Sequence, residues 1–159
     1  MLNYFNAFKK SAFRVETLQE YNVDEEKHDY EYFLKYKKLP GWFWDWDDWC
    51  DIIQQAKARW AIMQRVHIIQ FPMSSYLSFE VEAYKKNIIA WEEIFYIPFE
   101  ECSIKIESDF WMFDDTTVLK MYYDKDGSFL GFEEIKDIDP YLQIRDFLLK
   151  NKRNIGEVF

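Results

Sequence analysis

Two apolar segments that flank an amphipathic stretch constrain the fold of this chain more than any other feature. Residues 62–71 and 93–97 are rich in β-branched and aromatic side chains, and each segment is followed by a proline. Both segments therefore predict buried strands. The residues from 75 to about 87 repeat apolar side chains with helical spacing, after a serine that can cap the helix. Strand, helix and strand together predict a right-handed crossover that joins two parallel strands.

The rest of the chain predicts an α+β fold. Short strands are expected over residues 109–113, 118–123 and 129–135, with an Asp126-Gly127 hairpin turn before the last of them. A further strand is expected near the N-terminus, at residues 12–18. The expected architecture is a single domain, residues 1–159, with a mixed sheet of about five strands covered by about four helices. The sheet would combine one strand–helix–strand crossover with an antiparallel hairpin or meander.

The tryptophan-rich segment 41–49 is the least ordinary part of the sequence. Asp45 can cap a helix in which apolar residues recur at spacings of three and four, so we expect these residues to form a buried stripe. Trp42 and Trp44 lie outside the periodic run, and they predict either a staple at the start of the helix or an exposed interaction patch. The expected stripe comprises Trp46, Trp49, Ile53, Ala56 and Trp60.

Charge narrows the set of partners. The chain has 20 Lys and Arg residues against 29 Asp and Glu residues, for a net charge of −9. Such a surface repels a phosphate backbone, so direct nucleic-acid binding is disfavoured, while basic proteins remain possible partners.

Cys50 and Cys102 form no CxxC pair and no disulfide framework. No apolar run approaches the roughly 18 residues of a membrane span. We expect a cytoplasmic protein that does not bind a membrane.

Glu80 is the strongest single candidate for a functional residue. On a helix from about 75 to 87, it lies in the middle of the face that should meet the sheet. A buried carboxylate without a partner costs several kcal/mol, so Glu80 should have a partner or a raised pKa. We expect Arg14 or Arg65 to pair with it. A general base or a ligand-binding carboxylate is the functional alternative.

Other carboxylates cluster around a strand and its turn. Asp109, Asp114 and Asp115 could hold a magnesium ion or manage protons, although Asp114-Asp115-Thr116-Thr117 is also ordinary turn chemistry. His28 and His67 have no second histidine at ligand spacing, so no metal site is expected. The chain has no GxSxG motif, no glycine-rich phosphate loop and no dinucleotide fingerprint. No cofactor and no standard catalytic machinery are therefore predicted.

Several blocks of sequence resemble a bacterial family of domains of unknown function. The blocks are residues 11–18 with Tyr21, residues 75–80 with Tyr84 and Asn87, and residues 109–115, followed by residues 121–124 and 127–131. The resemblance implies a functional cluster on the matching positions, and it implies proximity to helix-turn-helix regulators in the genome. The cluster comprises Arg14, Glu80, Tyr84, Asn87, Asp109, Trp111, Asp114 and Asp115.

The order of elements is also similar to half of a phospholipase-D-like domain. That superfamily uses a His-x-Lys nucleophile motif, which this sequence lacks. The similarity is one of fold alone and carries no catalytic assignment.

Two functional hypotheses follow. The first is a non-catalytic protein-interaction or regulatory module, which partners a DNA-binding regulator or acts as an acidic inhibitor of a nucleic-acid-binding protein. Trp42 and Trp44 would form its contact patch. The second is an enzyme or small-ligand binder with a pocket around Glu80, Arg14 and the Asp114-Asp115 turn. An open cleft that reaches Glu80 would favour the second hypothesis, and a sealed, paired Glu80 would disfavour it.

Overall fold

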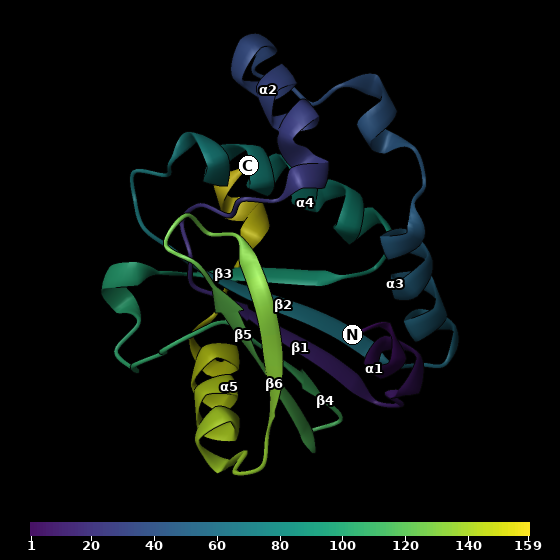
Figure 1. The fold of residues 1–159 in the computed structure, drawn as a ribbon, viewed down its shortest axis with the longest axis vertical. Coiled ribbons are helices and arrows are strands. Elements are labelled where there is room, and N and C mark those ends of the chain that lie inside the picture. The colour runs from purple at the N-terminus through teal and green to yellow at the C-terminus, as the bar shows by residue number, and fades with distance from the viewer.

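A computed structural model describes residues 1–159 as an α+β fold built on one mixed sheet of seven strands (Figure 1). The strands are β1 (Ser11–Glu16), β2 (Ile62–Ile69), β3 (Glu93–Pro98), β4 (Phe110–Phe113), β5 (Thr117–Tyr123), β6 (Phe129–Ile135) and β7 (Arg153–Asn154). The α-helices are α1 (Leu2–Ala7), α2 (Lys27–Tyr36), α3 (Asp48–Ala58), α4 (Ser75–Ile89) and α5 (Asp139–Asn151). None of them is long and apolar enough to cross a membrane.

The sheet has the order β6-β5-β4-β1-β2-β3-β7. Strands β1, β2 and β3 run parallel, and the other neighbours pair antiparallel. Helix α4 connects β2 to β3, so the predicted crossover is confirmed. The α+β class and the mixed sheet are confirmed too, whereas the predicted numbers of strands and helices were too low. Strand β7 is two residues long and exposed, so it leaves no hydrophobic pattern in the sequence.

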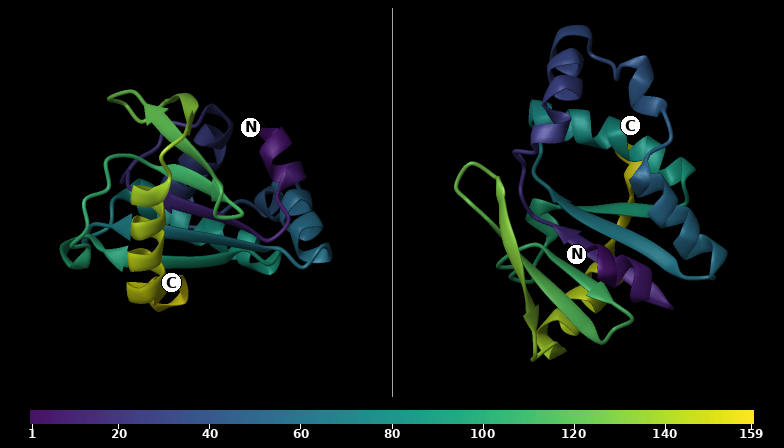
Figure 2. Two further views of the ribbon diagram at one scale, coloured as in Figure 1. Left: turned by 90° about the horizontal axis from the view of Figure 1, so that it is seen from below. Right: turned by 45° about the vertical axis from the view of Figure 1, so that its right-hand side comes forward.

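The two faces of the sheet are covered differently (Figure 2). Helix α5 packs on one face, where Leu148 is fully buried against Phe13, Val15, Val66 and Phe110. Helices α1 and α3 pack on part of the other face around Phe5, Cys50 and Ile53, and α4 packs farther along it through Leu77, Val81 and Tyr84. Helix α2 projects away from the sheet at the top of Figure 1. The second face is therefore covered by two separate groups of helices.

The predicted tryptophan stripe was wrong at both of its ends. Helix α3 begins at Asp48, where Asp47 and not Asp45 is the N-cap and accepts a hydrogen bond from the Cys50 amide at 2.9 Å. Trp46 thus precedes the helix and is 55% exposed. Trp60 follows the end of the helix with a φ of 63° and is 93% exposed. Helical periodicity stops where the helix stops, so neither ring follows the buried face.

Candidate functional site

Four polar side chains share the middle of the second face because of strand alternation. Arg14 and Glu16 are two residues apart on β1, so they point to the same side of the sheet. On the neighbouring strand β2, Arg65 lies opposite Arg14 and His67 lies opposite Glu16. Two guanidiniums, a carboxylate and an imidazole therefore meet between the two groups of helices.

Glu16 is fully occupied by protein hydrogen bonds. Its carboxylate accepts from Arg14 Nε at 2.8 Å, from Arg65 at 3.1 Å and from the Tyr84 hydroxyl at 2.7 Å. The residue is only 2% exposed. Burial acts to raise its pKa, but the Arg65 and Arg14 guanidiniums outweigh burial and hold the pKa of Glu16 well below its usual range. Glu16 is thus a permanent carboxylate.

A second buried carboxylate, that of Glu92, also neutralises the guanidinium charge at this site. Glu92 is 2% exposed and accepts a hydrogen bond from Arg65 Nε at 2.9 Å. It also accepts from Asn87 at 2.9 Å and from the Trp49 indole at 3.3 Å. Arg14 and Arg65 are thereby matched by Glu16 and Glu92, which offsets the cost of burying them.

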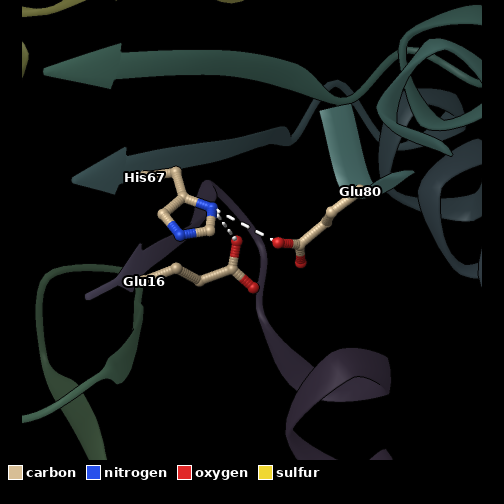
Figure 3. Close-up of side chains that lie close together, drawn as sticks. All are labelled: Glu16, His67 and Glu80. Atoms are coloured by element: carbon tan, nitrogen blue, oxygen red, sulfur yellow. Dashed lines mark ion pairs between the residues drawn. The ribbon is translucent and has the colours of Figure 1, made fainter. Parts of the chain in front are cut away.

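His67 is neutral. Its Nε2 lies 2.8 Å from the Leu18 carbonyl, which can only accept, so Nε2 carries the proton. Burial lowers the pKa of His67. Its Nδ1 lies 2.8 Å from the Tyr84 hydroxyl and 3.6 Å from carboxylate oxygens of both Glu16 and Glu80 (Figure 3). A neutral ring offers Glu80 little attraction at that distance.

Glu80 is the one member of this cluster that makes no hydrogen bond with the protein. Its side chain is 13% exposed, and Oε2 is fully buried without a partner. Burial raises the pKa of Glu80 well above its usual value, and the nearby Glu16 and Glu26 add to this effect. The predicted ion pair between Glu80 and Arg14 or Arg65 was wrong, because both guanidiniums bind Glu16 instead.

Glu80 lies at a cavity of about 770 Å³ lined by 26 residues. This volume falls within the range of about 300–1,000 Å³ that is usual for small-molecule sites. The predicted residues Arg14, Tyr84, Asn87 and Trp111 also line the cavity. Its walls are rich in aromatic rings, among them Tyr21, Trp42, Phe43, Trp49, Tyr76 and Tyr123.

Asp109 supports the cavity from behind and does not line it. Its carboxylate is 1% exposed and accepts hydrogen bonds from the amide and the hydroxyl of Thr17, at 2.8 and 2.7 Å, and from the Tyr21 hydroxyl at 2.5 Å. Tyr21 in turn faces the cavity. Asp109 therefore positions a lining ring, a role that sequence reasoning did not assign to it.

The Asp114-Asp115 turn lies away from the cavity, contrary to the predicted pocket. Asp114 accepts hydrogen bonds from the backbone amides of Lys9, Lys10 and Ser11 at 2.8, 2.6 and 3.0 Å. Asp115 binds Arg145 of helix α5. The two aspartates adopt φ values of 51° and 58°, which Asp tolerates in tight turns. Their contacts are those of a structural turn that fixes the start of β1.

Trp42 and Trp44 are both exposed, at 51% and 44%. Trp42 lines the outer part of the cavity, where its indole donates to Asp29 at 2.8 Å and its ring stacks on His28 with centroids 5.4 Å apart. Trp44 packs edge-on against Phe43, with centroids 5.7 Å apart. Only Trp42 of the predicted patch therefore belongs to the cavity.

One group of side chains could ligate a metal ion. Glu16, His67 and Glu80 each place one ligand atom within 4.8 Å of the others (Figure 3). No sequence pattern indicates this group, because its members come from three elements far apart in the chain. The two guanidiniums bound to Glu16 oppose a divalent ion, since they would lie beside it as like charges.

Sequence reasoning missed Glu16, His67, Glu92 and Tyr123 as members of the site. The alternation of Arg14 and Glu16 on one strand was the available signal, since it places both charges on one face of the sheet. Glu92 stands outside any helix or strand, where spacing carries no information about side-chain direction.

The fold and the site define a class of protein: an α+β domain with a mixed sheet and a partly polar cavity under its long connecting helix. The chain belongs to the family described as Domain of unknown function (DUF6879), whose model matches residues 1–152. The predicted membership of a family of unknown function is thereby confirmed. No curated protein and no solved structure matches the chain. The likeness to a phospholipase-D-like domain stays a prediction from the order of elements.

Proposed function

We propose that this protein binds a small ligand in the cavity that reaches Glu80. The observation that carries the proposal is a carboxyl group without a protein hydrogen bond at the wall of a cavity of about 770 Å³. Native proteins pair nearly all buried polar atoms, and the exceptions tend to mark functional positions. A ligand that binds Glu80 would complete the site.

The remaining groups of the cavity support the same proposal. Glu16, Arg65 and Tyr84 hold one another in place, so the surroundings of Glu80 are fixed before a ligand arrives. Fixed polar groups lower the entropic cost of binding. The aromatic walls would bury the apolar part of a ligand, which is the general pattern of small-molecule sites.

A ligand screen by thermal shift tests the proposal. Ligands that bind the folded state raise the melting temperature by mass action, and the Trp42, Trp49 and Trp111 rings around the cavity should report binding through their fluorescence. The expected result is at least one compound that both raises the melting temperature and changes tryptophan emission.

Two substitutions by tryptophan serve as controls for the screen. Ala83 lines the cavity, so Ala83→Trp should fill it and abolish binding. Ala58 is exposed at the end of α3, so Ala58→Trp should leave binding unchanged. Ligands that bind Ala83→Trp as well as wild type would place binding elsewhere and overturn the proposal. A broad screen that yields no ligand would also overturn it.

A second candidate function rests on the exposed tryptophans of the segment before α3. Trp42, Trp44 and Trp46 are 51%, 44% and 55% exposed, and rings of this size are common at the centres of protein interfaces. The family resemblance suggests a helix-turn-helix regulator as the partner, and the acidic surface suits a basic one. Copurification with such a regulator that is lost in a Trp42→Ala/Trp44→Ala double variant of unchanged melting temperature would support it.

A further inference from the structure

The arginine and lysine side chains of the cavity are already neutralised by the protein. Arg14 binds Glu16 at 2.8 Å, and Arg65 binds the same carboxylate at 3.1 Å. Lys86 binds Asp47 at 2.6 Å and the Phe43 carbonyl at 2.9 Å. An anionic ligand would have to compete with these carboxylates for each arginine and lysine side chain that lines the cavity.

Several acidic groups of the cavity have no cationic partner. Glu80 makes no hydrogen bond, Glu26 accepts only from the Tyr76 hydroxyl at 2.9 Å, and Asp29 accepts only from the Trp42 indole at 2.8 Å. Burial raises the pKa of both Glu80 and Glu26, and nearby carboxylates raise it further. A cation in the cavity would relieve this repulsion.

The protein already holds cations against aromatic rings at this site. The Arg14 guanidinium lies 5.3 Å from the centre of the Trp111 ring, and the Arg65 guanidinium lies 5.3 Å from the centre of the Tyr84 ring. These distances fall within the roughly 6 Å over which a ring attracts a cation. Other rings of the cavity, such as Tyr21 and Tyr76, have no protein cation against them and could contact a charged ligand in the same way.

We propose that the ligand is a small organic ammonium compound, whose charged nitrogen pairs with Glu80 and whose apolar body lies against the aromatic walls. This inference rests on the proposed function, because it names the chemistry of the ligand that the same cavity would take. The ammonium group would supply the hydrogen-bond donors that Glu80 lacks in the free protein.

A matched series of probes tests the charge of the ligand. 2-Phenylethylamine is a cation, 2-phenylethanol is neutral and 3-phenylpropanoate is an anion, and all three share one ring and a similar length. By isothermal titration calorimetry at neutral pH, we expect the amine to bind the intact protein at least about tenfold more tightly than the alcohol. The carboxylate should bind more weakly still.

Two variants of helix α4 test the role of Glu80. Glu80→Gln keeps the size of the side chain and cannot ionise to pair with an ammonium group, so it should weaken amine binding about tenfold and leave alcohol binding unchanged. Glu82→Gln is the control, because Glu82 lies two residues away, pairs with Lys85 and does not line the cavity. It should bind the amine as wild type does. Melting curves of both variants verify that each is folded.

The outcomes separate the two proposals. Equal or tighter binding of the alcohol or the carboxylate, abolished by Ala83→Trp, would overturn the ammonium assignment and keep the cavity as a ligand site. Binding of manganese or zinc chloride that depends on Glu80, without amine binding, would replace the ammonium by a metal ion. Tighter binding of Nα-acetyl-lysine amide than of the phenyl amine would assign the site to a protein side chain instead. Failure of every probe and of the broad screen would overturn both proposals.

Discussion

The two faces of the sheet use the same strands for different purposes. On the face under α5, Phe13, Val15 and Val66 pack against Leu148 without any charged group among the buried residues. On the opposite face, the alternate residues Arg14, Glu16, Arg65 and His67 form a polar cluster beside a cavity. The first face forms an apolar core, which stabilises the fold. The second leaves a space between two groups of helices, and the polar groups are concentrated there.

The two glutamates of the second face show the same contrast at smaller scale. Glu16 accepts hydrogen bonds from two arginines and a tyrosine, so the fold has lowered its pKa. Glu80 has no such donor within the protein, so burial and its acidic neighbours have raised its pKa. A structural carboxylate and a carboxylate available to a ligand thus differ in the donors around them, although one projects from the sheet and the other from α4 into the same region.

The largest loss of stability should come from removing a guanidinium that pairs with the buried carboxylates beside the cavity. Arg65→Met removes the partner of both Glu16 and Glu92, so two buried carboxylates lose a donor. We expect the free energy of unfolding to fall by about 3–5 kcal/mol, measured by urea denaturation. Arg153→Met is the control, because it removes an exposed pair with Glu101 and should cost less than about 1 kcal/mol. Equal effects would mean that the buried cluster is not structural.

A substitution in the apolar core under α5 should act on stability through packing alone. Leu148→Ala opens a cavity under α5 at a fully buried position, and we expect a loss of about 3 kcal/mol in the free energy of unfolding. The affinity of the folded variant for a ligand of the Glu80 cavity should be unchanged, because no residue of α5 lines that cavity. A change in ligand affinity in the folded variant would show that the two faces are coupled.

Glu80→Gln should change the free energy of unfolding in the opposite direction and by a smaller amount. The substitution removes a buried carboxyl that has no hydrogen-bond donor, so we expect the variant to be more stable than wild type by on the order of 1 kcal/mol at neutral pH. Gain of stability with loss of ligand binding would mark a functional residue. A clear loss of stability would indicate that Glu80 has a structural partner.

The pH dependence of that difference can be predicted from the raised pKa. Because folding raises the pKa of Glu80 above 4.5, the folded protein retains a proton that the unfolded chain has released between pH 4.5 and the raised value. The contribution of Glu80 to stability therefore falls as pH rises through this window. The advantage of Glu80→Gln should be absent below about pH 4, grow above it and then level off. Thermal melts of both proteins across pH measure it, and a constant difference would contradict the raised pKa.

The smallest effect is expected at the exposed tryptophans. Because Trp42 and Trp44 are about half exposed, the Trp42→Ala/Trp44→Ala double variant should change the free energy of unfolding by roughly 0.5 kcal/mol. A loss of several degrees in melting temperature would show that these rings stabilise the fold and would remove the support for an interaction patch.

Local patterns predicted most of the fold. The parallel crossover through α4 follows from two apolar segments around a helical one, and the Asp126-Gly127 turn lies between β5 and β6 as expected. Trp46 and Trp60 were placed wrongly because periodicity does not reveal where a helix begins and ends. The position of Trp60 depends on one residue with positive φ, which no spacing predicts.

The site could be predicted only in part. Glu80 was identified from its place on an amphipathic helix. The arginine pair predicted for it was wrong, because the register of β1 and β2 places Arg14 and Arg65 against Glu16. Register is a long-range property that one sequence does not display. Asp114 and Asp115 resembled a site because turn chemistry and metal ligation use the same residue types.

The most direct test of the Glu80 site is a carbon-13 NMR titration of glutamate carboxyl groups, with the Glu80 signal assigned by its absence in Glu80→Gln. In the free protein, the Glu80 carboxyl should titrate well above 4.5, and saturating 2-phenylethylamine should move the titration to lower pH. A Glu80 signal that titrates at or below 4.5 and ignores the amine would show that this carboxyl already has a partner, and the proposed binding site would then be contradicted.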